Sequence, residues 1–368
     1  MAKSIYVTST QAYSGKSALC VGLLRRFQRD GYKVGYMKPV STSARVVCGD
    51  HIMDEDSHFV KEAFSLPDAV EDMAPVLLHD RQVAEVLDGH KQDYATRVKA
   101  AYEQIAKGRD IVVLEGGGSL REGWIVELAP PHVSNLLEAP EIIVVPYVHD
   151  LQVVDDLITA RVRLGKTLIG GVVNSVPVHR LDLVKQKIKP YVEQHRVPIL
   201  AVLPKEHVLL SASVAELRDG LCGEVLCAPQ HLDGLVENVV IGAMNVDSAL
   251  TYFRRKANKA VITGGDRSDI LLAALETSTT CLVLTGNLRP SPMIIGRAEE
   301  KGVPILMTYH DTFTVVEMIE GFFGKTRFHQ QNKIDRLDAM LEQNLDFATL
   351  YGALGLRCGS PLSTQGGR

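Results

Sequence analysis

The sequence predicts an α/β protein whose first part is a parallel sheet with helices on both faces. From residue 4 to about residue 205, short runs rich in valine and isoleucine alternate with helical stretches, a pattern typical of such a sheet. A Gly-Lys-Ser motif closely follows the first of these runs. A second alternation starts near residue 239, and 368 residues leave room for two domains.

Each expected strand is a short apolar run bounded by glycine, proline or charged residues. These runs cover residues 4–8, 33–38, 111–115, 141–145, 167–174 and 199–203, and then 239–244, 260–263, 281–285 and 305–309. The first helix is expected over 17–29, where Leu19, Leu23 and Phe27 recur at helical spacing. Later helices are expected over 246–256, 269–276, 291–301, 311–322 and 332–344.

We expect a domain boundary near residue 210, inside a stretch of broken periodicity at 207–238. The first domain would then span 1–208 and a smaller α/β domain 209–325. A C-terminal helical segment is expected over 326–355, and its apolar side could pack on either domain or on a partner. Residues 356–368 have turn formers and almost nothing to bury, so this tail is expected to be disordered.

The composition excludes several classes of partner and site. With 40 basic and 44 acidic residues the net charge is -4, which gives no positive field for nucleic acid or a membrane surface. Six scattered cysteines without a CxxC pair fit a reducing compartment. No signal-peptide core, long apolar run or paired histidine motif is present. We therefore expect a cytoplasmic protein whose partners are small molecules or proteins.

Gly15, Lys16 and Ser17 open the first helix after the first strand, which is the context of a phosphate-binding loop. Backbone N–H groups and the positive helix end would hold phosphate oxygens, Lys16 would bridge the outer phosphates, and Ser17 would face Mg²⁺. The common motif has glycine where this chain has Thr10. The alternative is an ordinary strand-to-helix turn with Ser17 as a cap.

Further polar residues follow strands that end at the same edge of the predicted sheet. Glu115 precedes three glycines and could reach the magnesium, although a glycine-rich turn after a core strand is the alternative. Lys38 and Thr42 end the second strand and would deliver a positive charge and a hydroxyl. Asp56 could supply another metal contact, or the acidic run around it could be a solvated helix start.

These residues, taken in order, resemble dethiobiotin synthetase and the related amide-forming cobyrinate synthetases. In that family the phosphate loop spaces its glycines six apart, so Ser9 stands where the first glycine would be. Residues 36–40 resemble its lysine-proline motif and residues 113–118 its glutamate-glycine motif. Asp56 falls where the family has a magnesium-binding aspartate, and residues 172–174 and 197–204 resemble its two adenine-holding segments.

The resemblance implies an ATP and Mg²⁺ site in which ATP phosphorylates a carboxylate or carbamate that an amine then attacks. The residues it implies for nucleotide binding are Thr10, Gln11, Ala12, Tyr13, Ser14, Gly15, Lys16, Ser17, Gly116, Asn174 and Pro204. Those implied for catalysis are Lys16, Lys38 and Thr42, and those for the metal are Ser17, Asp56 and Glu115. The substrate does not transfer, because residues 72–78 and 119–124 depart from the family's pattern.

The second alternation resembles the DRTGG domain, and residues 266–268 and 284–286 carry the likeness. In long phosphate acetyltransferases a DRTGG domain follows a dethiobiotin-synthetase-like domain in the regulatory N-terminal half. The remaining residues are too few for the acetyltransferase domain, so acetyl transfer is the least expected activity. Residues 266–269 could bind an anion or a nucleotide, or form a capped helix start with Arg267 in a salt bridge.

The expected function is an ATP-binding sensor or regulatory protein in which nucleotide at the first domain alters the second. Weak ATPase activity fits this role, and the resemblance implies a homodimer. The alternative is an ATP-dependent carboxylate-amine ligase whose small-molecule substrate is unknown.

Overall fold

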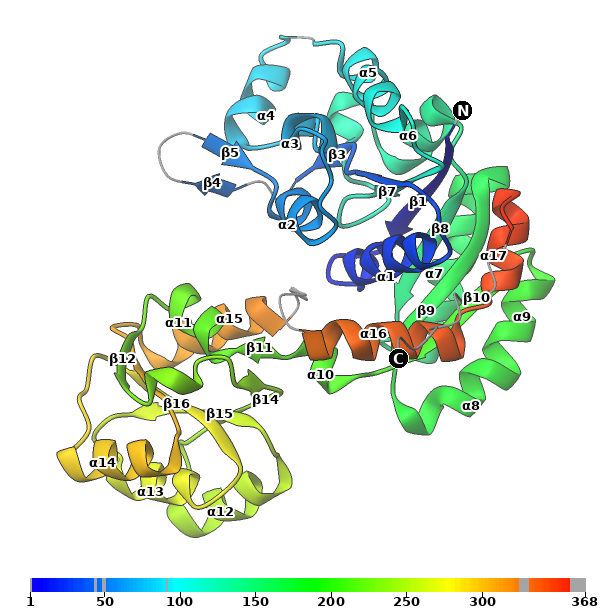
Figure 1. The fold of residues 1–368 in the computed structure, drawn as a ribbon. Helices are drawn as coiled ribbons and strands as arrows, with labels where there is room; N and C mark the ends of the chain where they lie inside the picture. The colour runs from blue at the N-terminus through cyan, green and yellow to red at the C-terminus, as the bar shows by residue number, and fades with distance from the viewer. Residues whose placement is uncertain (1, 43–44, 48–50, 91, 324–330, 358–368) are drawn as a thin grey trace, which may run out of the picture. The chain divides into compact units, whose positions relative to one another are not determined.

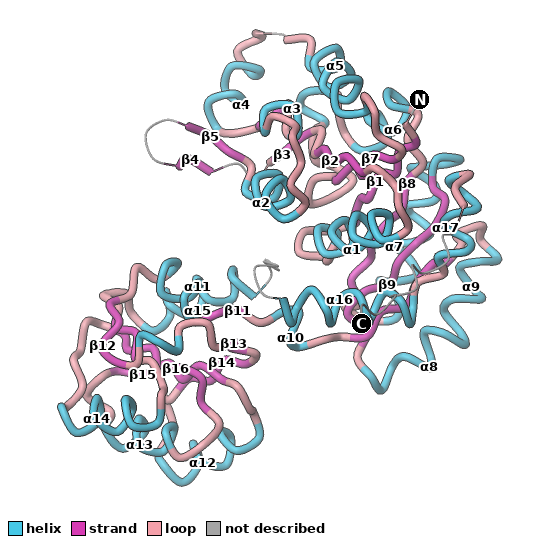
Figure 2. The backbone as a smooth tube through the Cα atoms, in the orientation of Figure 1, coloured by secondary structure: helices cyan, strands magenta, loops and turns pink. Residues whose placement is uncertain are grey.

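The computed structural model describes residues 2–42, 45–47, 51–90, 92–323 and 331–357. The chain divides into two units, the described residues of Met1–Lys205 with those of Ile334–Arg368, and Glu206–Lys333. Figures 1 and 2 show the elements of each unit. The predicted boundary after residue 325, tail residues 358–368, Cys48 and Cys358 lie outside the described residues.

The first unit is built on a six-stranded sheet in which every neighbouring pair is parallel. Its order is β10-β9-β8-β1-β7-β2. The strands are β1 (Lys3–Ser9), β2 (Val34–Met37), β7 (Ile111–Glu115), β8 (Glu141–Pro146), β9 (Leu168–Val176) and β10 (Ile199–Pro204). All six predicted strands are present and parallel, which confirms the predicted fold class. The segment after β1 therefore leaves the middle of the sheet.

Helices and short strand pairs complete this unit. The helices are α1 (Lys16–Arg29), α2 (Glu55–Ala63), α3 (Val70–Met73), α4 (Asp80–Leu87), α5 (Tyr94–Ala106), α6 (Pro130–Leu137), α7 (Asp150–Leu164), α8 (Leu181–Leu183) and α9 (Lys189–Gln194). The short strands are β3 (Val40–Ser41) beside β6 (Val76–Leu77), and β4 (Arg45–Val47) beside β5 (His51–Met53). A π-helical turn joins α8 to α9. These short strands have no periodicity that a sequence could reveal.

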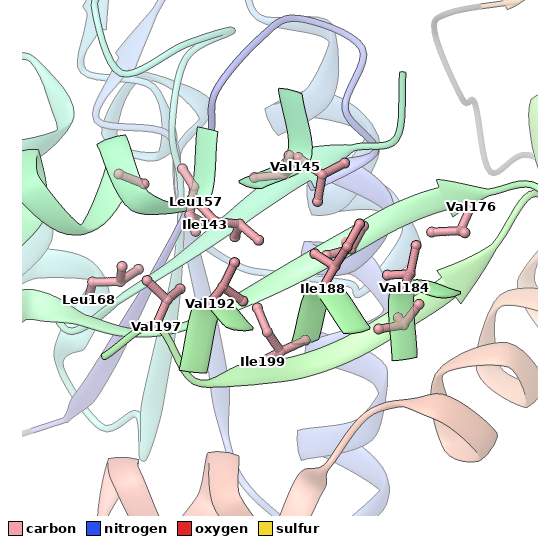
Figure 3. Close-up of a cluster of buried hydrophobic side chains, with 14 of the residues drawn as sticks. Ile143, Val145, Leu157, Leu168, Val176, Val184, Ile188, Val192, Val197 and Ile199 are labelled. Atoms are coloured by element: carbon pink, nitrogen blue, oxygen red, sulfur yellow. The ribbon is translucent and has the colours of Figure 1, made fainter. Parts of the chain in front are cut away.

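One face of this sheet is closed by a continuous apolar cluster. Figure 3 shows side chains from β8, β9 and β10 meeting those of the helices that cover them. Ile143 and Val145 of β8 lie with Leu157 of α7, and Ile199 of β10 lies with Val192 of α9. Burial of such side chains stabilises each by about 1.5–3 kcal/mol. The cluster holds the strands that frame the segment after β1.

The second unit has a five-stranded sheet of order β12-β17-β16-β15-β14. The strands β14 (Asn238–Ile241), β15 (Lys259–Gly264), β16 (Thr279–Thr285) and β17 (Ile305–Met307) are parallel, and β12 (Glu224–Cys227) is antiparallel to β17. The helices are α10 (His207–Leu210), α11 (Val214–Gly220), α12 (Val246–Arg255), α13 (Ser268–Leu275), α14 (Pro292–Lys301) and α15 (Thr312–Phe323). A small pair, β11 (Ala212–Ser213) with β13 (Leu235–Val236), lies beside them.

Both faces of this second sheet are covered. Val261 faces α12, α13 and α14 and packs with Phe253 and Ile270, whereas Ile262 faces α11 and α15 and packs with Leu217 and Val315. The four predicted strands are present. Residues 207–238, which the sequence analysis described only as irregular, contribute β12 to the sheet, because a four-residue strand gives too short a pattern.

The C-terminal helices α16 (Gln331–Asn344) and α17 (Phe347–Leu354) return to the first unit and pack on its phosphate-loop helix α1 (Figure 1). Arg25 of α1 forms an ion pair with Asp338 through three nitrogen–oxygen contacts of 2.9–3.2 Å. Phe27 packs against Tyr351 with ring centroids 5.6 Å apart. The predicted amphipathic helix is confirmed, and its apolar residues Leu337, Met340, Leu341 and Leu345 are all buried. The sequence alone did not predict whether this helix packs on the first domain, on the second domain or on a partner.

Gly22 on α1 lies against side chains of α16. A β-carbon placed there would lie 2.1 Å from a methyl carbon of Leu341. We expect Gly22→Ala to destabilise the unit by about 1–2 kcal/mol, since overpacking costs more than the gain in helix propensity. Gly352→Ala in α17 has open space and should stabilise by about 0.5–1 kcal/mol. Thermal unfolding followed by Trp124 fluorescence compares them, and equal stabilities would contradict this packing.

Glu141 is a buried carboxyl at the start of β8, in contact with β1. Thr8 and Thr167 donate hydrogen bonds to its two oxygens, each at 3.3 Å. Burial raises its pKa from about 4.5 to about 7, against the opposing effect of nearby hydroxyls. The folded chain therefore holds this proton more tightly than the unfolded chain. Its stabilising contribution is complete below the unfolded pKa and is lost as the pH rises through about 7.

Glu141→Gln is therefore expected to change the pH dependence of stability. At about pH 8 the variant should be more stable than wild type by about 2–3 kcal/mol, because glutamine needs no ionisation in the core. At about pH 5 most of this advantage should disappear. Urea unfolding at both pH values measures the difference, and an advantage that does not vary with pH would contradict the assignment.

Candidate functional site

The loop between β1 and α1 lies at the carboxyl edge of the first sheet. Gly15 occupies the position before α1 with a φ angle of 88°, which favours glycine. A β-carbon there would lie 2.2 Å from the Nδ2 atom of Asn174. Tyr13 also has a positive φ angle, 56°, and its side chain is exposed. The loop thus enters α1 through two residues in the left-handed region, Tyr13 and Gly15.

Two observations make this helix start a candidate anion site. No side chain caps α1, and its first turn has no acidic residue, so its N–H groups and positive dipole end are available to an anion. Ser14 is 1% exposed, and in the part of the chain that the structure describes its buried hydroxyl has no hydrogen-bond partner. A buried hydroxyl without a partner is costly. A phosphate oxygen would satisfy it.

Neighbouring elements hold this loop in place. Asn174 of β9 donates from Nδ2 to the carbonyl oxygen of Ser14 at 2.8 Å. Thr10 donates its hydroxyl to Asp156 of α7 at 3.2 Å. Ser9 contacts the carbonyl oxygens of Gln11, at 3.1 Å, and of Gly118, at 3.2 Å. Asn174, which the resemblance placed beside adenine, thus contacts the phosphate loop itself.

Glu115 ends β7 directly beside the start of α1. It accepts a hydrogen bond from the Ser17 hydroxyl at 2.5 Å and another from the Tyr36 hydroxyl at 2.9 Å. Its carboxyl is almost fully buried. Burial and the negative charge of Asp56 raise the pKa of Glu115, against the lowering effect of the two nearby lysines. The raised pKa means that the charged form of Glu115 is disfavoured, and a bound cation would stabilise that charged form.

Lys38 directly follows β2, and its buried side chain lies between two aspartates. Its Nζ atom lies 2.9 Å from Asp54 and 2.7 Å from Asp56. Burial alone would lower the pKa of Lys38, but Asp56 and Asp54 together raise it above its ordinary value. Asp54 also accepts hydrogen bonds from Ser41, at 2.6 Å, and from the backbone of Ser57, at 2.8 Å, which caps α2. The ammonium group is therefore fixed and charged.

The donor set around Ser17 fits a magnesium ion. Ser17 and Glu115 are in contact, and Asp56, whose side chain is 43% exposed, acts on Glu115 electrostatically. Among the described residues no group of three or more histidine, cysteine, aspartate or glutamate side chains could hold a metal by itself. Mg²⁺ commonly takes one or two carboxylates and completes its shell with water and substrate phosphates. This site has that composition.

The remaining predicted site residues are Gly116, Thr42, Pro204, Gln11 and Ala12, and their surroundings differ. Gly116 packs against β1, where its N–H donates to Val7 at 2.8 Å. Thr42 donates its hydroxyl to Glu122 at 2.5 Å. Pro204 ends β10, and two strands, β9 and β8, separate it from β1. Gln11 is half-buried and Ala12 is exposed.

Three residues of the site, Asp54, Tyr36 and Glu122, were not predicted as participants. Asp54 lies three residues before Ser57, a spacing typical of a helix cap, and this signal could have separated its role from that of Asp56. Tyr36 and Glu122 gave no such signal, because their partners Glu115 and Thr42 lie 79 and 80 residues away. Only the fold brings them together.

In the second unit, residues 266–269 form a helix start with local contacts. Arg267 pairs with Asp269 at 3.0 Å and donates to the carbonyl oxygen of Met244 at 3.1 Å. No side chain caps α13. The salt bridge expected for Arg267 is confirmed, and its guanidinium is engaged within the unit. The expected cap is wrong, because neither Asp266 nor Ser268 caps α13.

Comparison with known families follows the same division of the chain. Residues 3–213 match the family described as AAA domain. The chain belongs to the AAA domain family. Residues 216–322 match the family described as DRTGG domain. The AAA domain thus contains the phosphate loop, Glu115 and Lys38, and the DRTGG domain contains the five-stranded sheet.

Curated relatives show the same two-part arrangement. The chain is 26% identical to a phosphate acetyltransferase of Nitratidesulfovibrio vulgaris and 26% identical to one of Synechocystis, over 96% of this chain and 52% of each relative. It thus spans about half the length of these relatives. An ATP-dependent dethiobiotin synthetase of Caldicellulosiruptor saccharolyticus is 24% identical over 32% of this chain and 49% of its own. The predicted resemblance to the N-terminal half of phosphate acetyltransferases is confirmed.

Within the described residues, no helix combines the length and the apolar character needed to cross a membrane.

Proposed function

We propose that the AAA domain binds ATP with Mg²⁺ and that the chain acts as a nucleotide-dependent regulatory module. The observation that supports this most directly is the buried, unpartnered Ser14 hydroxyl beside the uncapped start of α1. Such a helix start, preceded by a strand and a glycine-containing loop, is a favourable phosphate site. The described residues offer this hydroxyl no other partner.

The roles of the neighbouring side chains follow from their chemistry. Lys16 would neutralise charge on the outer phosphates, and Asn174 would keep the loop in position through its bond to Ser14. Ser17, Asp56 and Glu115 would hold Mg²⁺, which supplies charge neutralisation between the phosphates. Lys38 would add a fixed positive charge beside the metal ligands.

The regulatory part of the proposal draws on the similarity to phosphate acetyltransferases. Those relatives share both domains with this chain over nearly its whole length. We propose that nucleotide in the AAA domain alters the DRTGG domain, with at most slow ATP hydrolysis. A homodimer belongs to the same proposal through the resemblance. The four cysteines in the described residues are free, which supports a reducing, cytoplasmic location.

A carboxylate-amine ligase is the second candidate, and one observation favours it. Lys38 and Glu115, at positions that match the synthetase motifs, converge on the phosphate loop with Ser17. Phosphate release that rises when a particular amine or carboxylate is added would establish the ligase. Release that stays slow with every such compound would favour the regulatory module.

Hydrogen exchange measured by mass spectrometry, with and without ATP and Mg²⁺, tests the proposed function. We expect slower exchange in the loop over residues 10–17 and altered exchange within residues 206–333. Lys99→Ala, an exposed change on α5, should behave as wild type. Protection confined to the loop would contradict the regulatory part, and no protection anywhere would contradict nucleotide binding.

A further inference from the structure

A carboxylate of the chain itself occupies a pair of hydrogen-bond donors beside the phosphate loop. The Oε2 atom of Glu122 accepts from the Gly118 N–H at 2.7 Å and from the Thr42 hydroxyl at 2.5 Å. One oxygen thus receives two donors from separate parts of the chain. We call the Gly118 N–H and the Thr42 hydroxyl the donor pair.

The backbone around the donor pair is shaped to admit this carboxylate. A β-carbon on Gly117 would lie 2.6 Å from one Glu122 oxygen, and a β-carbon on Gly118 would lie 2.3 Å from the other. Any larger residue at either position would displace the side chain. Gly123, with a φ angle of 90°, would place a β-carbon 2.6 Å from the Leu128 carbonyl oxygen. Glycines therefore permit both the close approach of the Glu122 carboxylate and the turn that brings it back to Gly118.

The position of the donor pair links it to the nucleotide site. The carbonyl oxygen of Gly118 accepts a hydrogen bond from Ser9, the residue that ends β1. A β-carbon on Gly118 would lie 3.4 Å from that of Ala12 in the phosphate loop. Gly118 also follows Glu115 by three residues. The donor pair thus borders the loop on the side of the metal-ligand candidates.

The charge of Glu122 has no cationic partner among the ion pairs of the described residues, since neither of its contacts is charged. The half-buried Glu122 carboxylate is thus held by two neutral donors. Donors that hold a carboxylate from within the chain would equally hold a carboxylate of a bound small molecule. The intramolecular group has the advantage of a high effective concentration.

We propose that Glu122 is an internal competitor that closes a carboxylate-binding subsite beside the phosphate loop. A ligand carrying a carboxylate enters only by displacing Glu122 from the Gly118 N–H and the Thr42 hydroxyl. Glu122 therefore determines which second ligand the AAA domain accepts. This inference does not depend on nucleotide binding, because the donor pair is complete without it.

The test is a titration of the full chain with acetate, in the absence of nucleotide, followed by Trp124 fluorescence. Trp124 is the single tryptophan of the chain, lies two residues from Glu122 and is 54% exposed. Glu122→Ala is expected to bind acetate at least about tenfold more tightly than wild type. Glu103→Ala, an exposed change of the same charge on α5, is expected to match wild type.

Two further variants distinguish release of the donor pair from the mere removal of a negative charge. Glu122→Gln removes the charge but keeps a carbonyl oxygen for the donor pair, so it should gain much less affinity than Glu122→Ala. Thr42→Val in the Glu122→Ala background should abolish the gain. Equal acetate affinities in wild type and Glu122→Ala would overturn the proposal, as would a gain in Glu122→Gln equal to that in Glu122→Ala. Since Lys16 takes no part, a failure of ATP binding leaves this result unaffected.

Discussion

Lys16→Ala is expected to weaken ATP binding by about 30-fold or more. Removing a cation that contacts a desolvated anion costs about 2–5 kcal/mol, and each 1.4 kcal/mol is about a factor of ten. Alanine preserves helix α1 because it has the highest helix propensity. The loss should therefore appear in affinity and leave the thermal midpoint of the free protein nearly unchanged. Calorimetric titration with ATP and Mg²⁺ measures it.

The matched control is Lys99→Ala, which removes the same charge from the exposed face of α5. It is expected to bind ATP with wild-type affinity, because a surface charge at that distance is screened by salt. If Lys16→Ala bound ATP as tightly as Lys99→Ala, the nucleotide phosphates would not lie against the start of α1.

Lys38→Met is expected to destabilise the first unit by about 3–5 kcal/mol, because it leaves a buried carboxylate without its cation. Asp54 is essentially inaccessible to solvent and lies 2.9 Å from the Lys38 ammonium. Urea unfolding followed by Trp124 fluorescence reports on this unit, which contains the only tryptophan. Breaking the exposed Arg81 pair with Glu85 by Arg81→Met should cost less than about 1 kcal/mol.

A double variant identifies the source of the effect. Lys38→Met with Asp54→Asn removes both buried charges, and asparagine can still cap α2. We expect this pair to recover most of the stability that Lys38→Met loses. A Lys38→Met variant within about 1 kcal/mol of wild type would show that Asp54 does not depend on the ammonium group.

Most parallel strands of both units could be predicted because burial on both faces makes them continuous apolar runs. The edge strand β14 is only partly buried, but its valines and isoleucine still mark it as a strand. The sequence predicted all ten of these strands and the amphipathic helix α16. It could not predict the partner of α16, because an apolar face indicates burial but not the surface that covers it. The contacts of Gly22 and Arg25 with α16 span more than 300 residues of sequence.

Some residues of the candidate site could likewise be predicted from the sequence, and others could not. Residues adjacent to the strand ends, such as Ser17 and Glu115, could be predicted to meet because carboxyl ends of parallel strands share an edge. The roles of Asp54 and Glu122 depend on loops whose path no periodic pattern specifies. Two acids near each other, Asp54 and Asp56, look alike in sequence, and only burial separates the one that holds Lys38 from the one left partly exposed.

The measurement that tests the account most directly is a calorimetric titration of the full chain with ATP, with Mg²⁺ and again with a chelator. The arrangement of Ser14, Ser17 and Glu115 predicts one saturable site per chain. Binding should be at least about tenfold tighter with Mg²⁺, because the metal offsets the repulsion between the phosphates and the carboxylates. No saturable binding at millimolar ATP under either condition would contradict the nucleotide site.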